Sequence, residues 1–260
     1  MNNFIGKNLN LIRLSFKEFL FPGMDFCLRK RLKLAKKYLL RGGYKTLDAG
    51  CGNGAFSFLC YKLGNSVLGI DINYLNIKKC LEFRDYRYIS PSRLKFLVFD
   101  IYDILKLNET FDQIICFETL EHILRDRYIL ELFAKILNPN GIIHLGVPNL
   151  NCPYYYGEKI SNTENGGHVR KGYDYFSIQQ LIKGLGLDII KLSGYGGIFT
   201  RKVTALSRRI QYNYVFKKSP VFLKHFLIFL WFSITYPLTY LDGLFKEEFM
   251  SIYIIFKKSE

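Results

Sequence analysis

Three glycines at alternate positions constrain this chain more than any other feature. They occur in the stretch TLDAGCGNGAFSFL at residues 46–59, within a chain that is rich in aromatic residues and lysine. Glycine is used where the backbone needs a positive φ or where another group approaches the main chain closely. Small and apolar residues precede the glycines, and apolar residues at helical spacing follow them. The stretch therefore predicts a strand, a tight loop that could wrap around a ligand, and a helix.

Short apolar segments alternate with helical patterns after this loop. We expect strands at residues 46–49, 66–71, 94–100, 111–117, 141–147 and 187–192. The clearest helical patterns cover residues 120–137 and 177–185. This alternation predicts an α/β fold with a doubly wound, mostly parallel sheet that is covered on both faces. The last strand, expected at residues 249–256, follows its predecessor without a normal crossover, so we expect it to be antiparallel.

Positive charge is concentrated outside the central part of the chain. The net charge is +15, yet residues 46–188 hold 15 Lys and Arg against 16 acidic residues. Residues 1–45 hold 11 against 2, and residues 189–241 hold 8 against none. Basic segments can bind nucleic acid or an anionic membrane surface, although a drift of composition toward lysine gives a similar imbalance.

These patterns suggest four parts of the chain. We expect a basic helical cap at residues 1–45, with an amphipathic helix at residues 24–41, and a core at residues 46–195. A helical insertion at residues 196–246 would precede the last strand of the core sheet at residues 247–260.

The cysteines indicate a reducing environment. None of the six belongs to a C-x-x-C pair, which favours free thiols, and the N-terminal residues lack the pattern of a signal peptide. We therefore expect a cytoplasmic protein.

An aspartate ends each of the first three strands. Asp48 precedes the glycines, and a carboxylate so close to a pyrophosphate would be repelled, so the loop differs from the dinucleotide fingerprint G-x-G-x-x-G. Asp71 could accept both hydroxyl protons of a ribose. Asp100 could accept from an adenine amino group, with Ile101 beside the ring. Aspartate also caps helices, but three in register favour a ligand site.

Five stretches share the order and spacing of a known family's motifs. LDAGCGNG, VLGIDIN, FLVFDIYDI, FDQIICFETLEHI and ILNPNGIIHLGVPN resemble the successive motifs of class I S-adenosylmethionine-dependent methyltransferases, over about residues 40–195. The resemblance implies a seven-stranded Rossmann-like sheet with a reversed last strand and S-adenosylmethionine as cofactor. It implies that the residues that bind this cofactor are Asp48, Gly50, Cys51, Gly52, Gly54, Asp71, Ile72, Asp100, Ile101, Phe117 and Glu118.

The stretch CFETLEHI offers a candidate metal site. Glu118, Glu121 and His122 would share one face of a helix and could ligate a divalent ion. The stretch resembles that of ubiquinone-pathway O-methyltransferases, in which such a set is assigned to magnesium. The sequence alone favours the alternative without metal, in which Glu118 lies near the cofactor while Glu121 and His122 cap and pack the start of a helix.

The stretch GGHVRKGYDYFS at residues 166–177 lies where the family places residues on the acceptor side. His168 is the candidate general base, because histidine titrates near neutral pH, and Tyr173 could hold the acceptor. The alternative is that His168 is simply a loop histidine bonded to a carbonyl.

The insertion contains the apolar and aromatic run VFLKHFLIFLWFSITYPLTYL at residues 221–241. A spanning helix needs about 20 apolar residues, but Lys224, His225 and Pro237 interrupt this run, and the last strand must return to the sheet. The run could be a lid over the acceptor pocket, a segment lying on an anionic membrane, or a helix pair packed in the core.

The sequence therefore predicts a methyltransferase that acts on a small-molecule or lipid-linked acceptor, with oxygen as the expected acceptor atom. An RNA-binding methyltransferase-like protein and a membrane-associated module with a vestigial cofactor site are the alternatives. CFET stands where base-modifying relatives carry an Asn-Pro-Pro-Tyr-type sequence, which disfavours nucleic acid as the acceptor. A peripheral position on the inner face of the membrane remains compatible with the cytoplasmic prediction.

Overall fold

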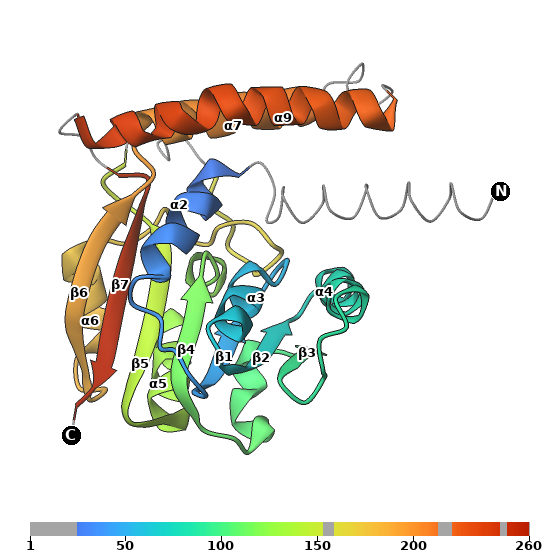
Figure 1. The fold of residues 1–260 in the computed structure, drawn as a ribbon. Coiled ribbons are helices and arrows are strands. Elements are labelled where there is room, and N and C mark those ends of the chain that lie inside the picture. The colour runs from blue at the N-terminus through green and yellow to red at the C-terminus, as the bar shows by residue number, and fades with distance from the viewer. Residues whose placement is uncertain (1–24, 153–158, 213–219, 245–248, 260) are drawn as a thin grey trace. The chain divides into compact units, whose positions relative to one another are not determined.

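The computed structural model describes residues 25–152, 159–212, 220–244 and 249–259 (Figure 1). The chain divides into two compact units, which we describe separately. The core unit comprises residues 31–195 and 248–260, and the helical unit comprises residues 1–30 and 196–247. The predicted basic helix is present as the shorter α2 (Phe26–Ala35), and residues 1–24 of the predicted N-terminal cap lie outside the described residues.

A seven-stranded sheet with the order β3-β2-β1-β4-β5-β7-β6 forms the centre of the core unit. Its strands are β1 (Lys45–Ala49), β2 (Ser66–Asp71), β3 (Leu94–Val98), β4 (Phe111–Phe117), β5 (Leu137–Pro148), β6 (Leu187–Tyr195) and β7 (Ser251–Lys258). Strand β7 lies antiparallel between β5 and β6, and the pairs among β1 to β5 are parallel. The predicted fold class and the reversed last strand are confirmed.

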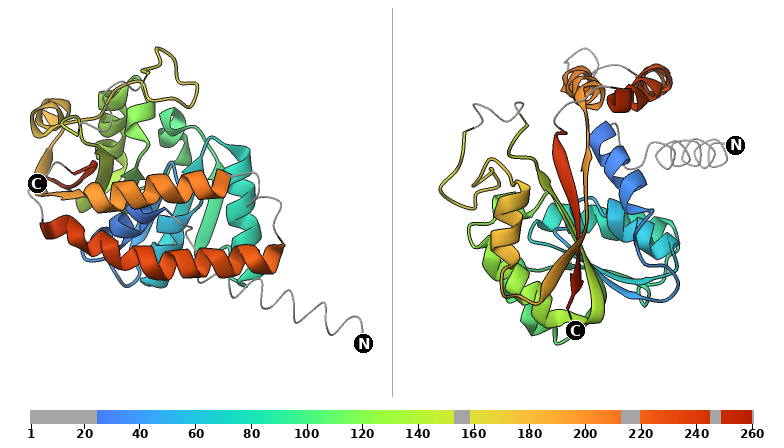
Figure 2. Two further views of the ribbon diagram at one scale, coloured as in Figure 1. Left: turned by 90° about the horizontal axis from the view of Figure 1, so that it is seen from above. Right: turned by 90° about the vertical axis from the view of Figure 1, so that its left-hand side faces the viewer.

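Helices cover both faces of this sheet, as the two views of Figure 2 show. Helices α3 (Ala55–Lys62) and α4 (Tyr74–Tyr86) lie on one face, and α5 (Asp126–Ile136) and α6 (Tyr175–Ile182) lie on the other (Figures 1 and 2). Side chains from the central strands, such as Leu47, Ile114 and Leu145, are fully buried between these layers. Burial on both faces explains why the strands read as continuous apolar runs.

The continuous helix predicted at residues 120–137 is wrong. The structure has a short 3-10 helix η2 (Leu120–His122), an extended residue at Ile123, and then α5. The Arg170 guanidinium donates to the carbonyl oxygens of Ile123 and Leu124, at 2.5 and 3.0 Å. These carbonyls therefore bond to a side chain from a distant loop instead of continuing the helix.

The carboxyl ends of β1, β2, β3 and β4 meet at one edge of the sheet. Strand β1 pairs with β2 on one side and with β4 on the other, so the strand order reverses beside β1. The crevice at such a reversal is where doubly wound sheets bind ligands. The glycine loop, the residues that follow β2 and β3, and the 3-10 helix η1 (Ile101–Leu107) all begin at this edge.

The helical unit contains α7 (Ile198–Tyr212), α9 (Val221–Leu238) and the 3-10 helix η4 (Thr239–Leu244). Helices α7 and α9 run side by side, and Trp231 Nε1 of α9 donates to Ser207 Oγ of α7 at 2.8 Å (Figure 2). Among the described residues, Phe226–Leu244 is the one stretch long and apolar enough to cross a membrane by length and composition, and 17% of its most apolar window is buried. None of the six cysteines forms a disulfide.

A buried histidine connects β5 to β7 inside the sheet. His144 Nδ1 lies 2.7 Å from the Tyr253 hydroxyl, and both side chains are fully buried. Because burial disfavours the charged imidazolium, it lowers the pKa of His144 to about 3. The unfolded chain would bind a proton at this histidine near pH 6.5, whereas the folded chain would not.

We therefore expect His144 to make the protein sensitive to acid. As the pH falls below about 6.5, the free energy of unfolding should decrease by about 1.4 kcal/mol per pH unit from this group alone. In His144→Gln this contribution should vanish, so the decrease between pH 7 and pH 5 should be about 2 kcal/mol smaller than in the wild type. Urea unfolding at the two pH values measures the difference, and equal decreases would contradict the assignment.

Candidate functional site

The glycine loop has the backbone conformation that its sequence predicts. Gly50, Gly52 and Gly54 have φ values of 76°, 52° and 75°, in the left-handed region. A Cβ added at Gly50 would overlap the Thr119 side chain, and one at Gly54 would lie 3.0 Å from Cys80 Sγ. A Cβ at Gly52 would meet no atom within 4 Å. The loop is thus packed against protein at its two ends and is open at Gly52.

The carboxylate of Asp71 ties the loop to the end of β2. Its Oδ2 accepts from Gly52 N at 2.8 Å, and its Oδ1 accepts from Asn73 N at 2.7 Å. The Asn73 side chain in turn caps α4 by accepting from the backbone of Leu75 and Asn76. Asp71 therefore fixes both the glycine loop and the start of the next helix while it faces the same cavity as Gly52.

A cavity of about 450 Å³ opens at this edge of the sheet. Seven of the predicted cofactor residues line it, namely Gly50, Gly52, Asp71, Ile72, Asp100, Ile101 and Glu118. Further lining residues that the prediction missed are Ile70, Asn73, Asn76, Phe99, Tyr102, Thr119, His122, Ile123, Glu164 and Gly166. Half of these directly neighbour a predicted residue, whereas Glu164 and Gly166 come from the loop after β5.

Four predicted cofactor residues do not line the cavity. Asp48, Cys51 and Phe117 are buried, Gly54 begins α3, and none of the four lines the cavity. Asp48 Oδ2 accepts from Ser57 Oγ in α3 at 2.5 Å. Burial raises the pKa of Asp48 to about 7. The expectation that Asp48 orients an ammonium group is therefore not supported, because its carboxyl group connects β1 to α3.

Glu118 stands at the border of the cavity in a strained conformation. Its φ of 49° is uncommon for a residue other than glycine. Its Oε1 accepts from the Tyr195 hydroxyl at 2.9 Å and lies 3.0 Å from Arg31 Nη2. Strain of this kind persists where surrounding contacts hold it, and it concentrates at functional sites. Neither Arg31 nor Tyr195 lies near Glu118 in the sequence, so no local pattern could have identified them.

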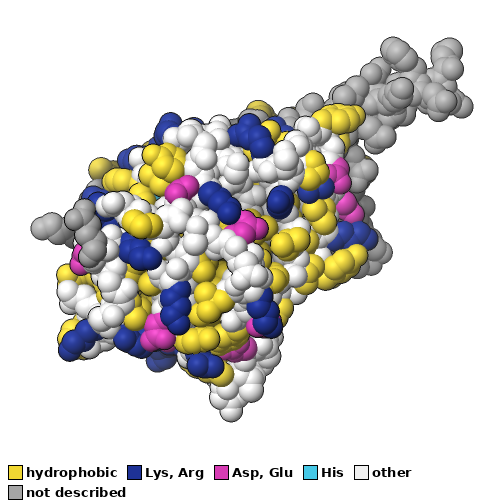
Figure 3. Space-filling view, turned by 90° about the horizontal axis from the view of Figure 1, so that it is seen from below, with side chains coloured by type: hydrophobic (Ala, Val, Ile, Leu, Met, Phe, Trp, Pro, Cys, Tyr) yellow, Lys and Arg dark blue, Asp and Glu magenta, His cyan; other side chains and the backbone are white. Residues whose placement is uncertain are grey.

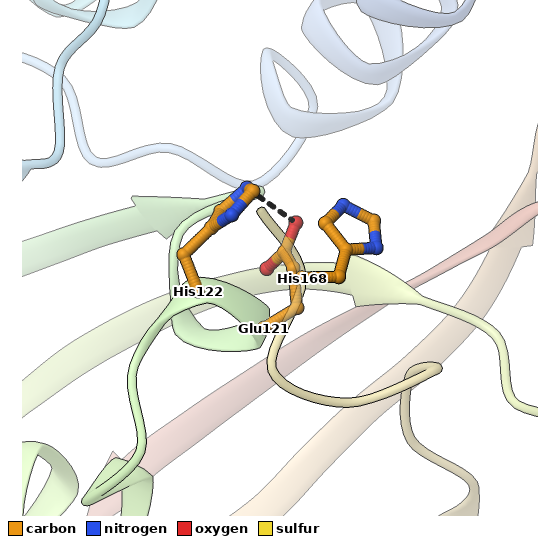
Figure 4. A group of neighbouring side chains, drawn as sticks. All are labelled: Glu121, His122 and His168. Atoms are coloured by element: carbon orange, nitrogen blue, oxygen red, sulfur yellow. Dashed lines mark ion pairs between the residues drawn. The ribbon is translucent and has the colours of Figure 1, made fainter. Parts of the chain in front are cut away.

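Three side chains that could hold a metal ion meet beside this cavity (Figure 4). Ligand atoms of Glu121, His122 and His168 all lie within 4.8 Å of one another. Glu121 is fully buried, and neither of its carboxyl oxygens has a hydrogen-bond partner among the described residues. His122 Nε2 lies 3.9 Å from Glu121 Oε1, and His122 Nδ1 lies 3.0 Å from Gly167 O.

The acceptor atoms of Glu121 and His122 in this cluster would be stabilised by a positive charge between them. If Nδ1 of neutral His122 donates to the Gly167 carbonyl, its Nε2 carries a lone pair, and this lone pair lies toward a carboxyl group that can also accept. Burial, with Glu118 adding to it, raises the pKa of Glu121 well above its ordinary value. A proton on Glu121 or a cation between the ligand atoms would relieve this arrangement.

The structure corrects two sequence-based expectations here. Glu118, Glu121 and His122 do not share a helix face, because Glu118 follows β4 directly and turns toward Arg31. The carboxyl group of Glu121 also caps no helix, since it has no hydrogen-bond partner among the described residues. The third side chain beside Glu121 and His122 is His168, and not Glu118 as the sequence suggested.

Tyr173 lies away from the cavity, contrary to its expected role in holding the acceptor. It is buried, and its hydroxyl lies 3.0 Å from Asp126 Oδ2 and 3.2 Å from Leu120 O. Burial raises its pKa above the ordinary value. These contacts connect the start of α5 to η2, which makes Tyr173 part of the scaffold that positions Glu121 and His122.

Comparison with known proteins finds similarity to methyltransferases. A family model for a methyltransferase domain matches residues 40–181. The mitochondrial ubiquinone biosynthesis O-methyltransferase of Bos taurus is 28% identical over 131 residues, which cover 50% of this chain and 35% of that protein. The ubiquinone biosynthesis O-methyltransferase of Pelagibacter ubique is 31% identical over 156 residues, which cover 57% of each chain. This chain therefore spans less than two thirds of the length of these two relatives.

A solved structure shares the fold. Coclaurine N-methyltransferase, bound to N-methylheliamine and S-adenosylhomocysteine (SAH), superposes with a TM-score of 0.60 at 18% identity. The match covers 88% of this chain and 72% of that one. A likeness at this level of identity shows the fold alone.

Asp71 and Gly52 provide a test of the cavity. Asp71→Ala should weaken the binding of SAH by roughly 1.5–3 kcal/mol, the usual loss for a hydrogen bond to a charged group. Gly52→Val should weaken it more, because its Cβ would project into the open side of the loop at a positive φ. Calorimetry measures both, with the surface variant Asp103→Ala as the control. A folded Asp71→Ala or Gly52→Val protein with wild-type affinity would refute the assignment.

Asp48 provides a test of the scaffold beneath the loop. Because its folded pKa of about 7 exceeds the unfolded value of about 3.9, stability should fall as the pH rises from about 4 to 7. Asp48→Asn keeps an acceptor for Ser57 but cannot ionise. Relative to the wild type, its free energy of unfolding should increase by up to about 4 kcal/mol between pH 4 and pH 8. Denaturant unfolding without ligand measures this, and a pH-independent difference would show that folding does not raise the pKa of Asp48.

Proposed function

Since the chain belongs to the S-adenosylmethionine-dependent methyltransferases, we propose that it methylates an oxygen of a small lipophilic acceptor with the help of a divalent cation. The family model covers more than half of the chain, and the enzyme class and the cofactor follow from membership. The acceptor, the acceptor atom and the cation are our proposals. The observation that carries the cation is the cluster of Glu121, His122 and His168, of which His122 lines the cavity.

The cavity suits S-adenosylmethionine. The loop is open at Gly52, so the cofactor would have room to approach the main chain there. Asp71 and Asp100 place carboxylates in the cavity at the ends of two strands. Asp71 would accept from the ribose hydroxyls, and Asp100 with Ile101 would border the adenine. The cofactor supplies an electrophilic methyl group on a sulfonium, so what the protein must add is the position of the acceptor oxygen.

The buried carboxyl oxygens of Glu121 also suit a cation. One carboxylate and two imidazoles form a mixed oxygen and nitrogen donor set, which fits manganese, iron or zinc better than magnesium. When bound, the cation would draw an acceptor hydroxyl to the site and lower its pKa, which makes the oxygen a better nucleophile. His168 would then act as a ligand and not as the predicted general base, because its ring lies among groups that a metal would share.

Glu118 would shape the acceptor side of the site. Arg31 and Tyr195 both bond to its carboxylate, which holds the side chain in one orientation at the cavity border. A fixed carboxylate there would repel an anionic acceptor and could accept from a hydroxyl that awaits methylation. Pre-organised groups of this kind lower the barrier, since they need not reorient during the reaction.

The proposed acceptor rests on the relatives. Two of them are named ubiquinone biosynthesis O-methyltransferases, which supports an oxygen of a lipophilic molecule. The N-methyltransferase shows that this fold also serves nitrogen acceptors. An RNA-binding function has less support, because acidic side chains stand among the scattered Lys and Arg side chains on the face shown in Figure 3. Binding along a nucleic acid favours a continuous basic surface.

Removal of the cation tests the proposal. Incubation with a chelator should abolish methyl transfer to a lipophilic phenol, and added manganese or zinc should restore it. His122→Ala and His168→Ala should each lower metal affinity by at least about 10- to 100-fold, because each removes a ligand, and loss of an outer-shell partner alone has an effect of that size. Bound metal is measured by elemental analysis, and transfer with a labelled methyl group.

SAH affinity and His144→Gln are the controls for this experiment. Both histidine variants should still bind SAH, and His144→Gln should keep its metal, because His144 is bonded to Tyr253. Full activity in the presence of chelator would rule out the cation and restore His168 as the candidate base. Chelator sensitivity that His122→Ala leaves unchanged would place the metal elsewhere.

A further inference from the structure

The helical unit has an unusual distribution of polarity. Hydroxyl side chains are buried inside it, namely those of Thr200, Thr204, Ser207, Thr235 and Thr239. Large apolar side chains on α9 are exposed, and examples are Phe226 at 53%, Leu230 at 45% and Ile234 at 59%. A helix pair in water is expected to bury its apolar residues and expose its hydroxyls. On α9 this expectation fails, because several of its large apolar side chains are exposed while hydroxyl groups of the unit are buried.

The hydroxyl groups form hydrogen bonds within and between the helices. Ser207 Oγ accepts from Trp231 Nε1 at 2.8 Å and donates to Val203 O at 2.7 Å. Thr235 Oγ1 donates to Trp231 O at 2.7 Å. Small hydroxyl residues between helices, with apolar residues on the outside, are the arrangement found where lipid surrounds the helices.

The exposed apolar residues form one continuous stripe on α9. Phe226, Leu230 and Ile234 follow one another at intervals of four residues, and Leu227 and Leu238 flank them. The half-buried residues of the opposite side include Trp231, Phe232 and Tyr236, and the Phe232 and Tyr236 rings stack on Phe26. The stripe is therefore the face of α9 that the rest of the helical unit leaves uncovered.

The positive charge of the helical unit indicates which kind of surface would bind the stripe. Residues 196–241 of the helical unit contain seven Lys and Arg and no Asp or Glu. On α7, Lys202 and Arg209 are exposed. Cations beside an apolar stripe match an anionic lipid surface, in which headgroups attract the cations and acyl chains solvate the stripe. The charged residues of α7 also make it unsuited to the hydrocarbon centre of a bilayer.

We propose that α7 and α9 lie in the interface of an anionic membrane, with the stripe of α9 among the acyl chains and the cations of α7 at the headgroups. The attachment is to one leaflet and does not cross the bilayer. It does not depend on the reaction proposed above, since it rests on residues of the helical unit alone. A lipophilic acceptor would be available at the same surface.

Vesicle binding by the full chain tests this inference. The protein should sediment with phosphatidylcholine vesicles that contain phosphatidylglycerol and not with pure phosphatidylcholine vesicles. Added salt should weaken the binding, because exposed charges are screened over about 10 Å at 0.1 M.

A variant of the stripe identifies the surface. Leu230→Ser combined with Ile234→Ser should weaken binding to anionic vesicles by more than about tenfold, because two apolar side chains lose their transfer into lipid. Leu105→Ser, which alters an exposed leucine of the core unit, is the matched control and should bind as the wild type does. Unchanged SAH affinity in both variants confirms that they are folded and keeps this test separate from that of the reaction.

Four results would overturn the inference. The first two are no binding of the wild type to anionic vesicles and full binding by the double variant. Retention of the protein in the membrane after an alkaline wash would indicate a spanning helix instead of an interfacial one. A lipid-free dimer that the double variant disperses would show that the stripe is a contact between two copies of the chain.

Discussion

The hydrogen bond from Gly52 N to the Asp71 carboxylate is the contact on which the cavity at the carboxyl end of β1 depends. It joins the loop after β1 to the end of β2, and Asp71 also bonds the residue that caps α4. Two strands, a loop and a helix are thereby fixed by one side chain that is still able to face a ligand. The cavity is pre-formed as a result, so that binding a ligand need not order the loop, which would cost conformational entropy.

Strands and strand-end residues could be predicted from the sequence because their signals are local. The predicted bounds of β2 and β4 agree with the structure, since each strand is a continuous apolar run that polar or glycine-rich residues flank. Asp71 and Asp100 were identified because parallel strands end at the same edge of a sheet. Asp48 has the same local signal, yet it is buried against Ser57, and nothing in its neighbours distinguishes a carboxylate beneath a loop from one beside a ligand.

The parts of the site that depend on contacts between distant residues could not be predicted. The helix expected at residues 120–137 is interrupted by Arg170, whose guanidinium bonds to two carbonyls that the pattern assigns to the helix. The same loop brings His168 to Glu121 and His122. Glu118 was expected beside Glu121, but Arg31 and Tyr195 hold it in another direction. In each case a contact with a side chain distant in sequence sets the local structure, and helical spacing of neighbouring residues could not predict it.

The two units both form hydrogen bonds to polar groups that they bury, but they expose different kinds of side chain. In the core unit, the buried polar groups Gln113 and His144 are each bonded to a partner, and apolar side chains fill the space between the sheet and its helices. In the helical unit, buried hydroxyls such as that of Ser207 are bonded as well, and large apolar side chains of α9 lie outside. Among the described residues, every buried hydroxyl oxygen of the two units has a hydrogen-bond partner, and the units differ in the side chains that they present outward. A water-facing surface would gain nothing from the leucine and isoleucine stripe of α9, whereas acyl chains would solvate it, so the outward side chains indicate the medium.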